Sequence, residues 1–136
     1  MNTITSGFLN NEQLAACKRL LQERSTACLE EIRGELLRSD NERYIELAGS
    51  VHDAAEESVA DLLSDVGLQS VDRLVQEAQD IEAALSRISN DNYGVCADCG
   101  EPIGYQRLSV YLTAKRCQPC QQRYENSHAG AGHASL

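Results

Sequence analysis

Apolar and small side chains recur every three or four residues over the first third of the chain. Steps of this size place side chains on one face of a helix. The pattern therefore predicts an amphipathic helix over residues 11–39. We expect Asn10 or Asn11 to cap it, because an asparagine oxygen can accept a hydrogen bond from a first-turn amide. The apolar face consists of Leu14, Cys17, Leu21, Ser25, Cys28, Ile32 and Leu36.

A second apolar stripe predicts another long helix between residues 53 and 89. Its first part is out of phase with the rest, and Gly67 at the join predicts a local kink. Between the two long helices, the segment ERYIELAG predicts a short helical piece that ends at Gly49 and Ser50. The later part of the stripe has the spacing of a coiled-coil seam, formed by Val71, Leu74, Ala78, Ile81, Leu85 and Ile88.

These elements predict an all-α fold built on an antiparallel coiled-coil hairpin, because neither apolar face is stable in water and the connection is brief. We expect a flexible N-terminus over residues 1–10 and the hairpin over 11–90, with its tip near 49–56. A small four-cysteine module follows over 91–125 and includes a short C-terminal helix after Cys117. The small and polar residues 126–136 are expected to form a disordered tail.

Composition and charge narrow the classes of function. The 136 residues include one Phe, five Tyr and no Trp, which favours thin helical packing over a thick core. The net charge of -9 disfavours binding to nucleic acid through a broad basic face. We find no long apolar run, export signal or lipidation motif, so we expect a cytoplasmic protein without membrane contact, in a reducing compartment.

Four of the six cysteines form two Cys-x-x-Cys pairs that are separated by seventeen residues. This spacing predicts a zinc site, because both sulfurs of each pair can point inward and two pairs complete a tetrahedron. Four thiolates leave no open coordination position, so we expect one structural zinc ion. Its ligands are Cys96, Cys99, Cys117 and Cys120.

Three other roles for these cysteines compete with zinc. Disulfides conflict with a reducing compartment, and a redox dithiol requires a strand and helix alternation that is absent from this pattern. An iron–sulfur cluster also uses four cysteines, but paired knuckles suit zinc better. Cys17 and Cys28 are interpreted as small buried apolar residues. His128 and His133 are interpreted as solvated residues of the tail, with a metal role as the alternative.

The four-cysteine module is also the most basic part of the chain. Its basic residues form either a small nucleic-acid-binding patch or a face that docks on a protein. We favour docking, because four positive charges and three tyrosines are weak evidence for DNA recognition. The possible docking residues are Arg107, Lys115, Arg116 and Arg123.

The stretch NYGVCADCGEPIGYQRLSVYLTAKRCQPC, residues 92–120, resembles the DksA/TraR family of bacterial transcription regulators. The match includes the aromatic-Gly start, the Ile-Gly-x-x-Arg-Leu segment at 103–108, the Thr-Ala at 113–114 and the gap between the cysteine pairs. The resemblance covers about residues 10–125. It implies a protein that binds RNA polymerase directly, docks its zinc module on the polymerase rim and inserts the hairpin tip into the secondary channel to modulate initiation.

The family's tip carries an Asp-x-x-Asp-x-Ala motif. The matching residues here are Ser50 to Ala55, so Asp53 and Ala55 carry over while a serine replaces the first aspartate. The resemblance therefore implies that Asp53 and Ala55 act at the polymerase. The alternative is that Asp53 and Glu56 form a capping box that starts the second long helix.

In the best-known family member, basic residues on the second helix and around the zinc module help to hold the alarmone ppGpp. The matching positions here are Asp80, Tyr111 and Gln121, and none of them is basic. We therefore expect weak or no dependence on ppGpp.

No nucleophile with an adjacent base stands out in the sequence, so we expect that the protein is not an enzyme. We also expect a monomer. We expect no sequence-specific DNA binding. Two alternatives remain: a zinc finger that binds nucleic acid by itself, and a coiled-coil adaptor for another protein partner.

Overall fold

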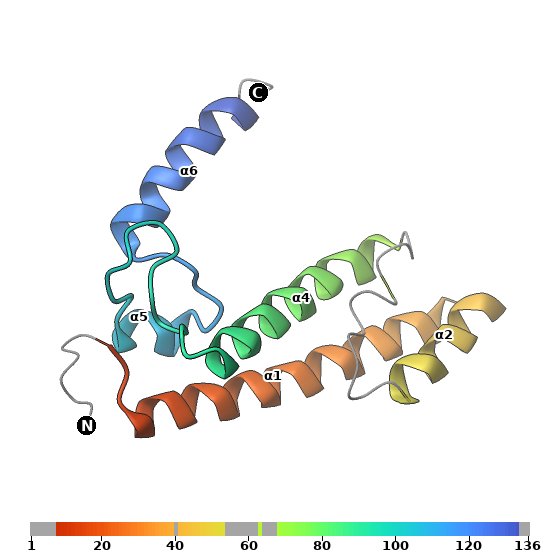
Figure 1. Ribbon diagram of the computed structural model, residues 1–136. Coiled ribbons are helices and arrows are strands. Elements are labelled where there is room, and N and C mark those ends of the chain that lie inside the picture. The colour runs from red at the N-terminus through yellow and green to blue at the C-terminus, as the bar shows by residue number, and fades with distance from the viewer. Residues whose placement is uncertain (1–7, 40, 54–62, 64–67, 134–136) are drawn as a thin grey trace. The chain divides into compact units, whose positions relative to one another are not determined.

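The computed structural model describes residues 8–39, 41–53, 63 and 68–133. In these ranges the regular elements are helices, and one isolated antiparallel bridge joins Val95 to Pro102. None of the described helices is both long and apolar enough to cross a membrane. Figure 1 shows the helices, which are α1 (Asn11–Arg38), α2 (Glu42–Asp53), α4 (Gln69–Ser89), α5 (Tyr105–Val110) and α6 (Gln118–His133).

The chain divides into two compact units. One is Arg19–Ser86, which we call the hairpin unit, and the other combines Met1–Lys18 with Arg87–Leu136 and is called the zinc unit. The boundary between them falls inside α1 and again inside α4. Each unit is described by itself.

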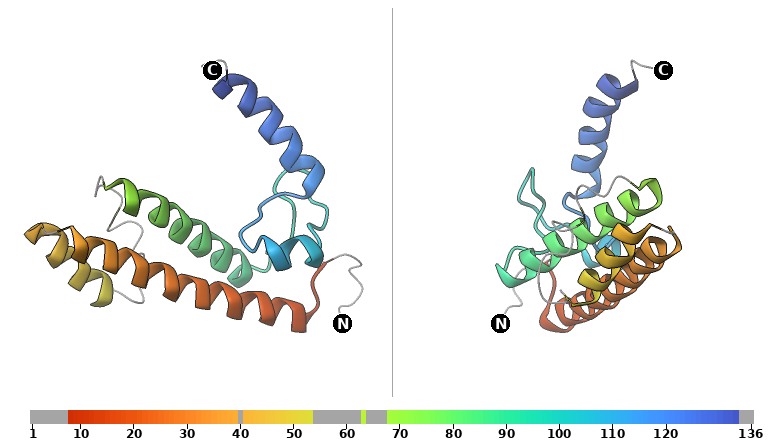
Figure 2. Two further views of the ribbon diagram at one scale, coloured as in Figure 1. Left: turned by 180° about the vertical axis from the view of Figure 1, so that it is seen from behind. Right: turned by 90° about the vertical axis from the view of Figure 1, so that its right-hand side faces the viewer.

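Within the hairpin unit, α1 and α4 are antiparallel neighbours (Figures 1 and 2). The Arg24 guanidinium pairs with the Glu77 carboxylate at 3.2 Å, and one turn further along α1 the Cys28 thiol donates to the Leu74 carbonyl oxygen at 3.1 Å. Rising numbers on α1 thus meet falling numbers on α4. The predicted antiparallel hairpin is confirmed.

The core of the hairpin unit follows the predicted stripe on α1, and it follows the predicted seam on α4 only in part. Cys28, Ile32 and Leu36 on α1 are buried, as are Val71 and Ala78 on α4. The helix α2 adds two residues to this core, Ala48 and Val51. On α4, Val75 is buried although the predicted seam left it out, whereas the seam residues Leu74 and Leu85 are only partly buried. The buried cluster consists of Cys28, Ile32, Leu36, Ala48, Val51, Leu63, Val71, Val75 and Ala78.

The start of α1 has the predicted cap. The Gln13 amide donates to the Asn10 side-chain oxygen at 2.8 Å, and the Asn10 amide donates to the Gln13 side-chain oxygen at 3.1 Å. This reciprocal pair satisfies two backbone donors that lack partners within the helix.

The short helix α2 is longer than predicted, because it passes Gly49 and Ser50 and ends at Asp53. The Ser50 hydroxyl donates to the Glu46 carbonyl oxygen one turn earlier, and Ala48 and Val51 are buried in the core. Burial of these neighbours offsets the poor helix propensity of glycine. The predicted kink at Gly67 and most of the first part of the second stripe lie outside the described residues.

The last helix also extends further than expected. Residues 126–133, which were predicted to belong to a disordered tail, continue α6 to His133. The His128 ring stacks on the Tyr124 ring with 3.9 Å between centroids, and its Nδ1 lies 2.8 Å from the Tyr124 carbonyl oxygen. These contacts between side chains one turn apart support the helix beyond residue 125.

Candidate metal centre

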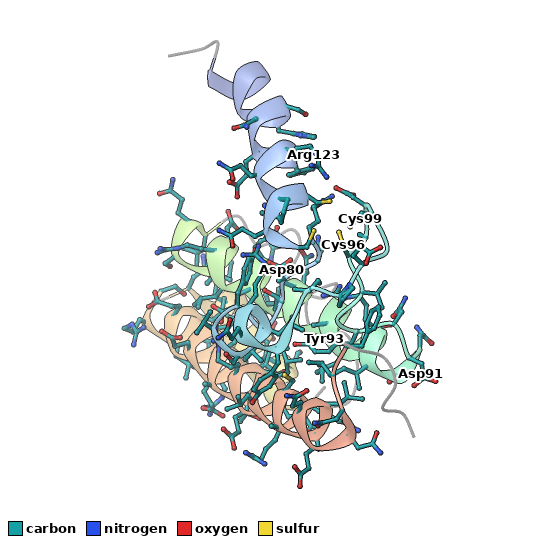
Figure 3. The ribbon with its side chains drawn as sticks, turned by 90° about the vertical axis from the view of Figure 1, so that its left-hand side faces the viewer. Asp80, Asp91, Tyr93, Cys96, Cys99 and Arg123 are labelled. Atoms are coloured by element: carbon teal, nitrogen blue, oxygen red, sulfur yellow. The ribbon has the colours of Figure 1, made fainter. Side chains whose placement is uncertain are left out.

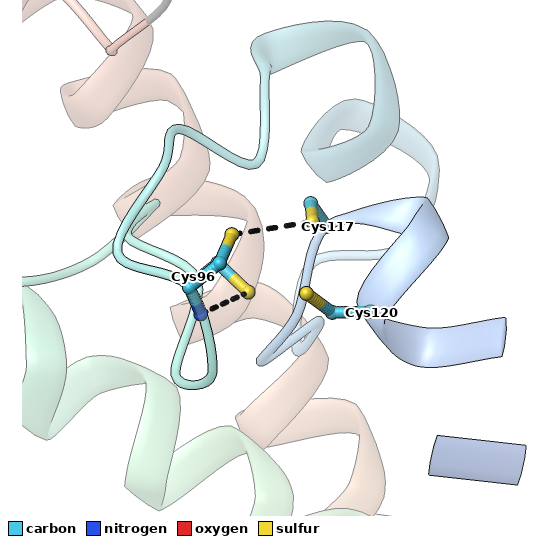
Figure 4. A group of neighbouring side chains, drawn as sticks. Cys96, Cys117 and Cys120 are labelled. Atoms are coloured by element: carbon cyan, nitrogen blue, oxygen red, sulfur yellow. Dashed lines mark hydrogen bonds between the residues drawn. The ribbon is translucent and has the colours of Figure 1, made fainter. Parts of the chain in front are cut away.

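The first Cys-x-x-Cys pair lies on a tight turn. The Cys96 amide donates to the Glu101 carbonyl oxygen at 2.9 Å, and the Gly100 amide donates to the Cys96 carbonyl oxygen at 3.0 Å. Gly100 has a φ of 76°, a left-handed conformation that other residues rarely adopt. The Cys99 amide also points at the Cys96 sulfur, at 3.5 Å (Figure 4). The turn therefore brings both sulfurs to its inner side.

The second pair lies at the start of α6. Cys117 immediately precedes the helix, Cys120 is in its first turn, and the Gln121 amide donates to the Cys117 carbonyl oxygen at 2.9 Å. Pro119 is tolerated there because first-turn amides have no partner within a helix. The helix thus fixes the spacing of these two sulfurs.

The four sulfurs converge on one point, as the spacing predicted. All four lie within 4.8 Å of one another, and the Cys99 and Cys117 sulfurs are 3.8 Å apart (Figure 4). A zinc–sulfur bond of about 2.3 Å gives a tetrahedron with edges of about 3.8 Å. The donor set and its geometry therefore fit one zinc ion held by Cys96, Cys99, Cys117 and Cys120.

The pKa values of the clustered thiols are shifted in opposite directions. Burial raises the pKa of Cys96, but hydrogen bonds from the amides of Cys99, Cys117 and Asp98 outweigh it and lower the pKa to about 6. Burial and the neighbouring thiols raise the pKa of Cys120 to about 12. A bound divalent cation would favour the thiolate form of all four ligands and release the protons that they still carry.

The other two cysteines are buried and lie in the helical core, as predicted. Cys17 is 1% exposed and Cys28 is 3% exposed. Burial and the nearby charges of Glu77 and Glu31 raise the pKa of Cys28 to about 11. All six cysteines are free thiols in the structure.

Three of the four possible docking residues make contacts inside the zinc unit. The Arg107 Nε donates to the Arg116 carbonyl oxygen at 3.1 Å, and the Arg116 Nε donates to the Asp98 carboxylate at 2.9 Å. Arg123 donates to the Cys120 sulfur at 3.0 Å. Lys115 has an exposed side chain. Docking remains a prediction for all four.

Sequence reasoning missed the ion pair between Asp98 and Arg116. Asp98 stands between the cysteines of the first pair, and Arg116 stands immediately before the second pair. Opposite charges beside the ligands of both pairs were the signal that could have revealed the bridge.

The predicted tip residues are described only in part. Asp53 lies at the end of α2, next to residues that the structure does not describe. Both interpretations of Asp53, as a residue that acts at the polymerase and as a capping box with Glu56, therefore stay predictions. The Asp53 side chain and Ala55 lie outside the described residues.

The three residues at the positions matched to ppGpp binding have no basic side chain of their own. The Asp80 carboxylate accepts a hydrogen bond from the Gln76 amide at 3.1 Å, and the Gln121 amide donates to the Glu125 carboxylate at 2.9 Å. Tyr111 is 44% exposed, with the Arg107 guanidinium 5.2 Å from its ring centroid. The two polar side chains are thus engaged by neighbours on their own helices.

Known proteins match both the metal centre and the helices. Residues 91–126 match the family of prokaryotic dksA/traR C4-type zinc fingers. The RNA polymerase-binding transcription factor DksA of Caulobacter vibrioides is 29% identical over 120 residues, which cover 87% of this chain and 80% of that protein. The protein of the same name from Escherichia coli K12 is 27% identical, over 84% of this chain and 72% of its own.

A solved structure has the same fold. The structure of transcription factor DksA2 from Pseudomonas aeruginosa aligns with a TM-score of 0.61 and 24% identity, over 93% of this chain and 94% of that one. The matched finger is of the C4 type, and the four sulfurs that it requires are those of the cluster. The metal centre is therefore one structural zinc site.

Proposed function

We propose that the chain is a member of the DksA/TraR family and a transcription regulator that binds RNA polymerase directly. The observation that carries this proposal is the extent of the similarity. Relatives named as RNA polymerase-binding factors align over 84% to 87% of the chain, which includes the hairpin as well as the zinc finger. A shared zinc finger alone would support a much broader set of functions.

The proposed mode of action uses the two units differently. The zinc unit docks on the rim of the polymerase, and the hairpin enters the secondary channel, where Asp53 and Ala55 alter initiation. Residues 19–86 include 16 acidic and 6 basic residues, a net charge of -10, so this unit is unsuited to binding DNA. The protein acts as a cytoplasmic monomer and catalyses no reaction.

Retention of core RNA polymerase by the immobilised protein tests the proposal. We expect retention without DNA, and we expect a second protein that occupies the secondary channel to displace the polymerase. If core enzyme is not retained, the proposed function is wrong. If it is retained but not displaced, the protein binds polymerase elsewhere and the secondary-channel mode is wrong.

The tip is tested separately from binding. Asp53→Asn should abolish the effect on initiation in a purified transcription assay while polymerase retention stays unchanged. Asp72→Asn is the matched control, because it removes one exposed carboxylate from α4. Equal activity of Asp53→Asn and the wild type would show that Asp53 has no role at the polymerase.

We further propose that ppGpp does not act through this protein at the Asp80, Tyr111 and Gln121 positions. One negative and two neutral side chains offer no cation to its phosphates. Addition of ppGpp to a purified system should leave the effect of the protein on initiation unchanged. A strong increase of this effect on addition of ppGpp would contradict this part of the proposal. It would not contradict the proposal that the protein binds RNA polymerase.

Two other functions give different results in the same assays. A nucleic-acid-binding zinc finger would bind duplex DNA by itself, with an affinity that falls steeply as salt rises. A coiled-coil adaptor for another partner would retain neither DNA nor core polymerase.

A further inference from the structure

Arg123 contacts the metal centre directly. It lies one turn after Cys120 on α6, and its guanidinium donates to the Cys120 sulfur at 3.0 Å. Figure 3 shows Arg123 on the helix that rises from the sulfur atoms. A donor that is hydrogen-bonded to a ligand fixes its orientation, and a charged donor on a thiolate makes a stronger bond than a neutral one.

Arg116 connects the two halves of the site. Its Nε donates to the Asp98 carboxylate, which lies between the first two ligands, and Arg116 itself immediately precedes Cys117. Its guanidinium also lies 3.9 Å from the ring centroid of Tyr124 on α6. The Arg116 side chain is 19% exposed and the Asp98 side chain is 45% exposed, so the arginine is largely shielded from water while the carboxylate is partly solvated.

We propose that Arg123 and Arg116 are positioning residues of the zinc site that slow loss of the metal. Arg123 holds the Cys120 sulfur in its ligating position, and Arg116 holds the first Cys-x-x-Cys turn against the start of α6. Zinc leaves when its ligands separate, and both contacts oppose this separation. Loss of such an outer contact typically lowers metal affinity about 10-fold to 100-fold.

Arg123→Gln tests the first contact. Zinc transfer from the purified, zinc-loaded protein to an excess of chromogenic chelator should be about 10-fold faster than in the wild type. Lys115→Gln is the matched control, because it removes one positive charge from the same unit at an exposed side chain, and it should release zinc at the wild-type rate. Equal rates for Arg123→Gln and the wild type, or equal acceleration by both variants, would overturn the role of Arg123.

A spectroscopic measurement separates this role from a general loss of stability. In the cobalt-loaded protein, Arg123→Gln should shift the sulfur-to-cobalt charge-transfer band, because the hydrogen bond changes the electron density on the Cys120 sulfur. Lys115→Gln should leave the band in place, and Arg123→Lys, which keeps a charged donor, should shift it less than Arg123→Gln. An unshifted band in Arg123→Gln would contradict the direct contact.

Arg116→Gln and Asp98→Asn, alone and combined, test the second contact. Each single variant should accelerate zinc release several-fold, and the double variant should be no faster than the faster single one, since both remove the same bridge. Wild-type rates in the single variants, or fully additive effects in the double variant, would overturn the role of Arg116. These measurements use no polymerase, so their outcome is independent of the proposed function.

Discussion

At the scale of single residues, Asp91 occupies a backbone conformation that disfavours an aspartate. It follows the end of α4 with a φ of 61°, and the next amide, of Asn92, donates to the Arg87 carbonyl oxygen at 2.9 Å. Glycine adopts this left-handed conformation without a steric cost, and a carboxylate is unfavourable at the negative end of a helix dipole.

Asp91→Gly is therefore expected to raise the free energy of unfolding by about 1 kcal/mol. Urea denaturation of the zinc-loaded protein measures the change. Asp91→Ala removes the charge but keeps a Cβ atom in the left-handed region, so its free energy of unfolding should rise by less than that of Asp91→Gly. A gain from Asp91→Ala as large as that from Asp91→Gly would assign the effect to charge alone.

Tyr93 joins three parts of the zinc unit through its hydroxyl group. The hydroxyl donates to the Leu112 carbonyl oxygen at 2.7 Å and is hydrogen-bonded to the Cys17 thiol of α1. Burial and the nearby Cys17 raise the pKa of Tyr93, so the hydroxyl stays a neutral donor. Tyr93 is 7% exposed.

Tyr93→Phe is expected to lower the free energy of unfolding by about 1–2 kcal/mol, because a buried carbonyl loses its donor. Tyr111→Phe is the matched control, since this ring is 44% exposed and its hydroxyl can reach water. Thermal and urea unfolding measure both variants. Equal losses would show that the Tyr93 hydroxyl contributes no more than a solvated one.

The metal ligands were predictable residue by residue, whereas their outer contacts were not. Two Cys-x-x-Cys pairs imply a site whatever the path of the chain between them. The bond from Arg123 to Cys120 depends on which side of α6 each faces, and the bridge from Arg116 to Asp98 depends on how the two turns meet. Such information is set by tertiary structure, so these bases were interpreted from charge alone as a docking face.

At the scale of the helical elements, α1 offers two adjacent leucines with opposite environments. Leu36 is fully buried in the hairpin core, and Leu37 is 43% exposed. Leu36→Ala is expected to lower the free energy of unfolding by about 2–4 kcal/mol, while Leu37→Ala should change it by about 0.5 kcal/mol or less. Urea denaturation of both variants is the measurement, and similar effects would contradict the assigned face of α1.

The helix faces were more predictable than the helix ends. Three-four spacing identified the buried face of α1 because burial on a helix depends on local geometry. The ends depend on contacts made elsewhere: Val51 packs into the core and carries α2 past Gly49, and the Tyr124–His128 stack supports α6 past residue 125. Local propensity predicted a break at the first position and a disordered tail at the second, and tertiary or side-chain contacts outweighed it.

At the scale of the whole molecule, the charge is divided unequally between the two units. The hairpin unit has a net charge of -10, and the zinc unit, with six basic and five acidic residues, has a net charge of +1. The units also differ in what stabilises them. The hairpin unit has its own apolar cluster, whereas the four-cysteine module has few buried hydrophobic residues: Tyr93, Ile103, Leu108, Leu112 and Ala114, besides two of the ligands.

Removal of zinc should therefore unfold one part of the molecule and leave the other. A module with so small a core depends on its metal for folding, since metal binding supplies free energy that apolar burial does not. After chelation, hydrogen–deuterium exchange should show loss of protection over residues 93–120, while residues 28–36 and 71–81 stay protected, and added zinc should restore the first region. Cys99→Ser should reproduce the chelated pattern without a chelator. Protection that persists over residues 93–120 without metal, or that disappears from both regions together, would contradict this separate dependence of the two units.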